Sequence, residues 1–231
     1  MTLLNISPFA ISRWCAFFNH FDLFFKGFLY TLGISFGALL LALILGILSG
    51  GLSTSKSKVG KLISRIYVEV FQNTPLLVQM VFVYYGLAII SNGHVMISAF
   101  FTAVLCVGLY HGAYISEVIR SGIEAVPKGQ TEAALAQGFT ANQTMQLIIL
   151  PQAVRTILPP MTNQVVNLIK NTSTVAIISG ADIMFVAKAW AYDTTNYIPA
   201  FAGAAIFYFV ICFPLASWAR KQEELNKKTY S

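Results

Sequence analysis

The chain has 231 residues, of which 56% are hydrophobic and only 10% are charged. An average soluble domain has roughly 25% charged residues, so the composition excludes an ordinary soluble domain, a disordered chain and a disulfide-stabilised scaffold. It predicts an all-α membrane protein with several spans, and the net charge of +6 is first considered as a signal of membrane topology.

The N-terminal part predicts one span with a shorter segment before it. Residues 27–55 carry no charge, and a helix needs about 20 apolar residues to cross the hydrocarbon core, so we expect the first span at about 27–52. The preceding aromatic segment 8–24 fits a short interfacial helix on the outer face, with Trp14 at the level of the headgroups. It fits a longer first span equally well.

Four further spans follow from the remaining apolar segments. No charged residue occurs from Val70 to Ser116, which is too long a run for one helix, and the polar turn at 91–94 divides it. Two more apolar regions come later, the first of them interrupted by Lys170 and Asp182. We therefore expect spans at about 70–90, 96–117, 160–187 and 198–219, all within one domain, 1–231.

The distribution of basic residues predicts the orientation of the chain. Most of them fall on one side of the membrane: Lys56, Lys58, Lys61, Arg65, Arg120, Lys128, Arg155, Arg220, Lys221, Lys227 and Lys228. The opposite side has only Arg13, Lys26 and Lys188. The positive-inside rule then places the C-terminus in the cytoplasm and the N-terminus outside, which agrees with an odd number of spans.

The long cytoplasmic connection after the third span predicts two short helices with a bend between them. Thr131 is the expected N-cap of the first helix, and Gly138 is expected to end it in a left-handed conformation. Thr140 with Gln143 three residues later matches a capping box for the second helix. We expect Pro151 to close that helix. Such a compact element is suited to docking a partner protein.

The same connection resembles a known family. Its fixed positions match the EAA---G---------I-LP motif of permease subunits of bacterial ABC importers at Glu132, Ala133, Ala134, Gly138, Ile148, Leu150 and Pro151. FQNTPLLVQ at 71–79 is similar to the FRGTPLLVQ segment of the polar amino-acid permeases of histidine, glutamine, arginine or glutamate type. Residues 114–134 and 158–173 also resemble that family, so the resemblance covers about residues 25–220.

The resemblance implies a type I ABC importer permease fold in the bacterial plasma membrane. It implies that the cytoplasmic loop at about 124–158 couples to the ATPase, with Glu132, Ala133, Ala134 and Gly138 as the coupling residues. The implied partners are two ATP-binding subunits, a second permease copy or a related permease, and an extracytoplasmic solute-binding protein.

The sequence places ATP chemistry outside this chain. It contains no GxxxxGK[ST] phosphate-binding loop. We therefore expect a transport subunit that is no enzyme and holds no cofactor, while a partner ATPase uses ATP and Mg²⁺. No binding of nucleic acid is expected, because the positive charge is explained by membrane topology and anionic lipid.

The fourth apolar region offers candidate contacts for a zwitterionic substrate. Lys170 and Asp182 lie about 18 Å apart along an ideal helix, and the polar, glycine-bearing stretch between them permits a broken helix. Asp182 would then receive the substrate ammonium, and Thr172, Ser173 and Thr174 would hold its carboxylate. The alternative is that Asp182 caps a helix end and that Lys170 anchors the packing.

A second candidate substrate cluster consists of Asn73, Thr74 and Gln79 around Pro75. Proline inside a spanning helix removes a backbone hydrogen bond and usually kinks the helix, so the kink would shape the translocation path. The alternative is a proline near a helix start with local capping.

The remaining polar residues predict structural roles. Glu117 and Arg120 are three residues apart on a helix and are interpreted as an interfacial ion pair. Cys15, Cys106 and Cys212 share no short spacing, and the histidines form no metal-ligand pattern, so we expect no metal site.

The leading hypothesis is the permease subunit of an ATP-driven importer that forms the translocation path. The small number of acidic groups in the spans favours glutamine, glutamate or aspartate, with the basic amino acids arginine, lysine and histidine as the alternative. A secondary amino-acid transporter acting alone is the alternative from another class, but such transporters commonly contain inverted repeats and none is found. Whether the permease pairs with itself or with a relative stays open, as does which of the two subunits holds the substrate.

Overall fold

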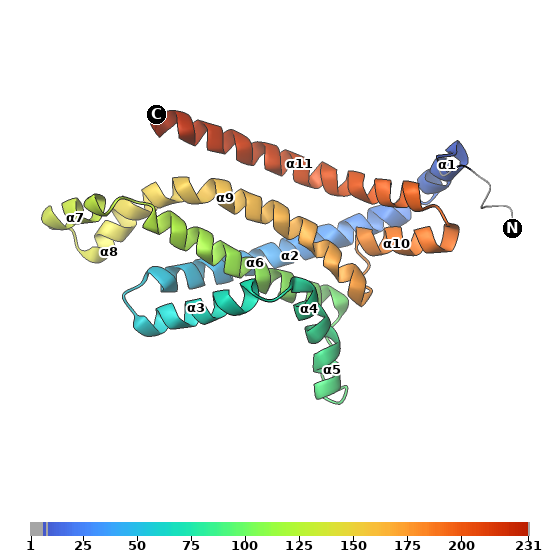
Figure 1. Cartoon of the computed structure of the whole chain (residues 1–231), viewed down its shortest axis with the longest axis horizontal. Helices are drawn as coiled ribbons and strands as arrows, with labels where there is room; N and C mark the ends of the chain where they lie inside the picture. Colours follow the sequence, from blue (N-terminus) through green and yellow to red (C-terminus); the bar gives the residue numbers. More distant parts are fainter. Residues whose placement is uncertain (1–6, 8, 231) are drawn as a thin grey trace. The chain divides into compact units, whose positions relative to one another are not determined.

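The computed structural model describes residue 7 and residues 9–230 (Figure 1), and within them every regular element is helical. Three of the helices are long and apolar enough to cross a membrane, namely α2 (Phe21–Thr54), α6 (Ala99–Glu124) and α11 (Tyr197–Tyr230). Two broken pairs of helices pass the same test together, so the described residues supply up to five spans.

The first broken pair surrounds Pro75. The pair consists of α3 (Lys58–Gln72) and a second segment made of α4 (Leu76–Val81), the π-helical η1 (Phe82–Gly86) and α5 (Leu87–Ile90). The break next to Pro75 is therefore confirmed, and Pro75 also stands directly before a helix start, so both sequence interpretations describe part of it. The expected start of a span near residue 70 falls inside α3, because a charge-free run does not reveal where a proline divides it.

The second broken pair lies where a polar stretch predicted it. Helix α9 (Leu150–Asn171) continues into the 3-10 helix η3 (Thr172–Ile178), and α10 (Ile183–Thr194) follows after a short gap. Ser179 ends η3 in a left-handed conformation with a φ angle of 58°. The predicted interruption is thus confirmed, whereas α9 begins ten residues before the expected span.

The chain divides into two compact units, which share the helices α2, α6, α9 and α11. Unit 1 comprises residues up to 38, 76–107 and 168–214, and unit 2 comprises 39–75, 108–167 and the residues from 215 onward.

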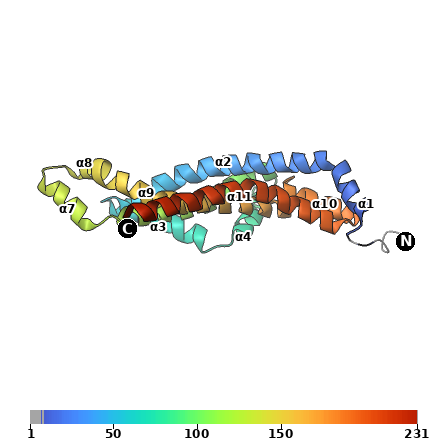
Figure 2. The ribbon, with the colours of Figure 1, turned by 90° about the horizontal axis from the view of Figure 1, so that it is seen from above.

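An aromatic core holds the outer helices of unit 1 together. Phe17 of α1 (Ile11–Asn19) packs against Phe24 and Trp190, with ring centroids 4.7 and 6.2 Å away. Figures 1 and 2 show α1 beside α10. Because His20 separates α1 from α2, the structure favours a separate short helix over a longer first span.

Close helix contacts and a chain of hydroxyl groups organise unit 2. Gly46 of α2 lies so close to Ile115 of α6 that a Cβ atom has no room there. Ser49 interacts with the hydroxyl groups of Ser64 at 2.8 Å and Ser116 at 2.9 Å, and all three are buried. These contacts fix α2, α3 and α6 against one another and thereby support the loop described next.

Candidate functional site

The loop that carries the EAA motif folds into two short helical segments that lie side by side in unit 2 (Figures 1 and 2). Helix α7 (Lys128–Ala136) ends at Gly138, whose φ angle is +89°. The amide of Gly138 donates to the carbonyl of Leu135 at 3.0 Å, and the amide of Phe139 donates to the carbonyl of Ala134 at 3.1 Å. This pair of bonds is a Schellman motif, so the predicted left-handed bend at Gly138 is confirmed.

The start of the second segment also follows the prediction. Helix α8 (Ala141–Gln143) begins after Thr140, whose hydroxyl accepts the Gln143 amide at 3.3 Å. The Gln143 side-chain oxygen in turn accepts the Thr140 amide at 2.8 Å, which completes the capping box.

Two expectations about helix ends in this loop are wrong. Thr131 is no N-cap, because α7 already begins at Lys128 after Pro127, and a proline fits before a first turn whose amides need no helical partner. Pro151 closes no helix, because α8, the π-helical η2 (Thr144–Ile149) and α9 follow one another without a gap. Pro151 is the second residue of α9, within the first turn of that helix, where proline is tolerated.

The four motif residues differ in their surroundings. Ala134 is 5% exposed and lies on the buried side of α7, where a larger side chain would not fit easily. Glu132 and Ala133 are exposed, and Gly138 forms the exposed bend. Ala134 and Gly138 therefore determine how α7 packs and ends, while Glu132 and Ala133 form its exposed surface.

Asp182 stands at the start of α10 and is fully buried. Its carboxylate accepts the amides of Phe185 at 2.9 Å and Met184 at 3.2 Å. The phenol of Tyr208 donates to the same carboxylate at 3.2 Å. Asp182 is thus an N-cap, which is the structural alternative that the sequence left open, and Tyr208 is a partner that sequence reasoning did not find.

The hydroxyl groups of Thr172, Ser173 and Thr174 all turn back onto the helix. They donate to carbonyl oxygens three residues earlier at 2.7, 2.8 and 2.7 Å. Thr172 is buried and interacts with Tyr208, which connects it with Asp182. Ser173, Tyr208 and Lys170 line a cavity of about 320 Å³ in unit 1. The structure therefore brings part of this predicted cluster together around Tyr208.

The second predicted cluster is divided between the two units. Asn73 ends α3 and donates to the backbone carbonyl and the carboxylate of Glu69, both at 2.8 Å. Thr74 donates to the carbonyl of Val70 at 2.8 Å. Both residues satisfy the end of α3, whereas Gln79 is half-buried in α4 of unit 1.

A cavity of about 570 Å³ in unit 2, lined by both polar and apolar residues, gathers residues that sequence reasoning did not assign to a substrate. It is lined from α3, α6, the residue directly after α6, and α9 by Gln72, Tyr114, Glu117, Val118, Ser121, Gly122, Ala125, Thr156, Pro160 and Gln164. Its volume lies in the range of about 300–1,000 Å³ that is usual for small-molecule sites. One available signal was the spacing of Tyr114, Glu117 and Ser121, which places them on one face of a helix.

The predicted ion pair lies at the edge of this cavity. The Arg120 guanidinium contacts Glu117 at 2.7 Å and Glu124 at 2.6 Å, so the prediction is confirmed and extended to a third residue. Gln72 and Glu117 also line a second, polar cavity of about 460 Å³ that includes Arg120. Glu117 and Arg120, with Glu124 as the second partner of the guanidinium, thus stand together where polar space is available.

Histidine, cysteine and acidic side chains are the possible metal ligands among the described residues. Among residue 7 and residues 9–230, no three histidine, cysteine or acidic residues gather as metal ligands.

The sequence from residue 21 to residue 224 matches the family described as the binding-protein-dependent transport system inner membrane component. The chain belongs to this family. It is therefore an ABC transporter permease, a transport component with several apolar helices in the bacterial plasma membrane.

Similar proteins agree with this assignment. The probable glutamine ABC transporter permease protein GlnM of Bacillus subtilis is 34% identical over 92% of this chain and 97% of that protein. The putative glutamine transport system permease protein GlnP of Rickettsia felis is 36% identical over 80% and 85% of the two chains. A crystal structure of an amino acid ABC transporter with histidines superposes with a TM-score of 0.84, at 31% identity over 91% of this chain and 97% of that one. The permease is thus one for amino acids.

Proposed function

We propose that this permease forms the translocation path of an ATP-driven importer of polar amino acids and couples it to a separate ATPase. The observation that carries the proposal is the exposed segment from Glu132 to Gly138, which ends in the Schellman motif at Gly138 and is followed by the capping box at Thr140. The chain contains no phosphate-binding loop of its own. The exposed segment is therefore suited to receive movement from a separate nucleotide-binding partner.

The proposed assembly has two ATP-binding subunits that use ATP and Mg²⁺, a second copy of the permease or a related one, and an extracytoplasmic solute-binding protein. The N-terminus of the permease lies outside and its C-terminus in the cytoplasm. This orientation puts the segment from Glu132 to Gly138, here called the coupling turn, on the side of the ATPases. The distribution of basic residues supports this orientation.

The proposed substrates are glutamine, glutamate and aspartate. Two similar permeases are named for glutamine, and the cavity of about 570 Å³ in unit 2 offers the amide side chains of Gln72 and Gln164. The similar structure determined with histidines keeps basic amino acids as the second candidate.

We place the amino acid in the cavity lined by Gln72, Tyr114, Glu117 and Gln164. Glu117 lines this cavity and supplies a carboxylate for the ammonium group. Its partner Arg120 lines the second cavity, which shares Gln72 and Glu117 with the first, and supplies a guanidinium for the substrate carboxylate. Asp182, with Tyr208 and the hydroxyl groups of Thr172, Ser173 and Thr174, is a second contact region, which opens only if α10 releases its N-cap. Asn73, Thr74 and Gln79 are further candidates.

The test is uptake into proteoliposomes that contain the permease, its ATPase and its binding protein. We expect ATP-dependent accumulation of labelled glutamine, with stronger competition by glutamate and aspartate than by arginine, lysine and histidine. Stronger competition by the basic amino acids would replace the proposed substrate class. Uptake driven by an ion gradient through the permease alone would show a secondary transporter instead.

Gln164→Leu tests the location of the substrate. Because the substitution keeps the approximate volume and removes the amide, we expect uptake at low glutamine to fall about tenfold, the effect of losing roughly one hydrogen bond at a buried site. Gln146→Leu is the control, because Gln146 is exposed and lines none of the cavities described above. Equal uptake by both variants would move the site to the region of Asp182.

A further inference from the structure

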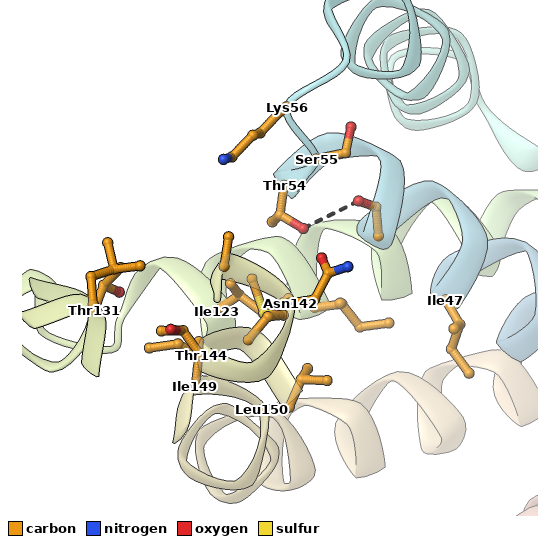
Figure 3. A pocket seen from close by; sticks show the side chains of 15 residues that line it. Ile47, Thr54, Ser55, Lys56, Ile123, Thr131, Asn142, Thr144, Ile149 and Leu150 are labelled. Atoms are coloured by element: carbon orange, nitrogen blue, oxygen red, sulfur yellow. Dashed lines mark hydrogen bonds between the residues drawn. The ribbon is translucent and has the colours of Figure 1, made fainter. Parts of the chain in front are cut away.

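An apolar cavity of about 770 Å³ lies in unit 2 between the end of α2, the end of α6 and the segment from α7 to η2 (Figure 3). This segment, Lys128 to Ile149, is called the coupling segment below. Its apolar walls are Ile47, Ile119, Ile123, Leu135, Met145, Ile149 and Leu150. None of its 15 lining residues is acidic. The cavity is thus mainly apolar, and none of its lining residues carries a negative charge that would repel an anion.

The polar lining comes from two places, the end of α2 with Thr54, Ser55 and Lys56, and the region from α7 to η2 with Thr131, Asn142 and Thr144. Thr54, Ser55 and Lys56 lie together on one side in Figure 3, and Leu150 lies on the opposite side. Lys56 is the first charged residue after the charge-free run 27–55, so it marks the level at which hydrocarbon gives way to headgroups. Ile47 lies about 10 Å along the helix before its end at Thr54, on the apolar side of that level.

We propose that this cavity binds one acyl chain of an anionic phospholipid from the cytoplasmic leaflet, with the lipid phosphate paired to Lys56. The proposal rests on the proposed orientation of the chain. A phospholipid combines a negative group at the membrane surface with an apolar chain beneath it. The cavity offers the cation Lys56 and, on the membrane side of Lys56, the apolar side chains of Ile47 and Ile119.

The exposure of the lining supports a lipid over a water-soluble partner. Ile47 is 58% exposed and Leu135 is 49% exposed, so both leave apolar surface uncovered. A soluble protein would have to reach below headgroup level to cover Ile47, whereas a lipid of that leaflet already lies there. Ile47 of α2 and Ile119 of α6, which packs beside Gly50, line the part of the cavity that the acyl chain would fill, and Leu135 of α7 lies at its cytoplasmic end.

The position of the lipid gives it a role in coupling. Thr131 and Leu135 of α7 and Met145 and Ile149 of η2 all face the same space. When the acyl chain fills it, α7 has a support through which force on Glu132 reaches α2 and α6. Anionic lipid should therefore raise ATP-driven uptake by the assembled importer.

The first experiment measures lipid retention by the full chain without partners, so it stands independently of transport. The chain is purified from nanodiscs of equal parts palmitoyl-oleoyl phosphatidylglycerol and phosphatidylcholine, and bound lipid is counted by native mass spectrometry. One phosphatidylglycerol should be retained. Lys56→Glu should lower its retention at least about fivefold, since one basic residue near the surface contributes on the order of that factor.

Lys58→Glu is the matched control, because it makes the same charge change two residues away and Lys58 does not line the cavity. We expect it to keep most of the retained lipid. Equal loss in both variants would show a diffuse surface attraction and overturn the site. Equal retention of phosphatidylcholine and phosphatidylglycerol by the wild type would overturn the role of the phosphate.

Gly51→Leu tests the apolar part of the cavity. Gly51 lines it, and a Cβ added there meets no atom within 4 Å, so a leucine enters the space without disturbing the helix. It should displace the lipid and lower ATP-driven uptake in phosphatidylglycerol membranes, while the chain stays folded. Leu48→Phe adds bulk to an exposed position of α2 outside the cavity and should change neither quantity.

A photo-crosslinking residue at Ile47 identifies the occupant in native membranes. A phospholipid adduct on the permease supports the proposal. An adduct with a free fatty acid, a second permease copy or the ATPase would overturn it in favour of that occupant. If the lipid results hold while uptake fails in every variant and in the wild type, the proposed importer function is at fault and the lipid site stands.

Discussion

Single residues direct the course of the coupling segment. Gly138 adopts a φ angle of +89°, and an added Cβ there meets no neighbouring atom, so backbone strain alone opposes a side chain. A left-handed conformation costs an L-residue roughly 1–2 kcal/mol, and more if it is β-branched. The motif thus needs glycine at this position for the direction of the chain and not for space.

We expect Gly138→Val to reduce ATP-driven uptake about tenfold or more and to weaken association with the ATPase. Gly138→Asn should retain far more activity, because asparagine tolerates the left-handed region. The measurement is uptake together with co-purification of the ATPase, with membrane insertion as the control. A valine variant that is as active as the asparagine variant would contradict the proposed coupling role of this bend.

Asp182 combines a structural role that the structure shows with a substrate role that we propose. Asp182→Ala should lower the free energy of unfolding by about 0.5–2 kcal/mol, because it removes the N-cap of α10. Asp182→Asn should leave stability nearly unchanged, since asparagine caps helices about as well as aspartate. Thermal unfolding in detergent distinguishes the two variants.

The same asparagine variant tests the substrate role of Asp182. A charge-assisted hydrogen bond contributes about 1.5–3 kcal/mol, so uptake at low substrate should fall on the order of ten- to a hundredfold. The yield of the assembled complex serves as the control. Normal uptake by Asp182→Asn would reduce Asp182 to a helix cap and leave the cavity around Gln72 and Gln164 as the site.

At the scale of elements, the helices of unit 2 approach each other where side chains are small. Gly46 faces Ile115, and Gly112 faces Tyr67, whose phenol donates to the carbonyl of Leu109 at 2.7 Å. Small residues are common at such contacts in membranes, because packing there replaces the hydrophobic effect as the driving force.

Gly46→Leu should destabilise the protein by about 1–3 kcal/mol, the usual cost of overpacking. Ile115→Ala in the same chain should recover part of that loss, since it frees the space that the leucine needs. The midpoint of thermal unfolding of the two single variants and the double variant measures this coupling. Additive effects of the two substitutions would contradict a direct contact between α2 and α6 at this point.

Element boundaries were predicted well where a local signal fixed them. The capping box at Thr140 and the bend at Gly138 depend on residues within one or two turns, and both are confirmed. The expected cap at Thr131 and the expected helix end at Pro151 are wrong, because a helix tolerates proline next to its start or within its first turn. Local residue preference does not decide between these arrangements.

At the scale of the whole chain, the proposed orientation predicts which loops face which side. In a background without cysteine, a cysteine at Lys128 should react with a membrane-impermeant thiol reagent only from the cytoplasm, and one at Asn92 only from outside. Both positions are exposed, so lack of access would not explain a negative result. The reverse pattern would overturn the orientation and with it the placement of the coupling turn.

The sequence alone determined the class of the protein and the family resemblance, and it indicated possible breaks near Pro75 and Ser179. Composition, charge and short-range signals determine these features, and each acts within a few residues or as an average over the chain. They do not depend on how helices meet.

Only the tertiary structure decided which side chains share a site. It joined Asp182 to Tyr208, 26 residues later, and gathered Gln72, Glu117 and Gln164 around one cavity. It also surrounded the apolar space beneath Lys56 with walls from helices far apart in the sequence. Helices in a membrane pack through many small contacts whose register one sequence does not reveal, so polar residues on different helices find their partners only when the fold is known.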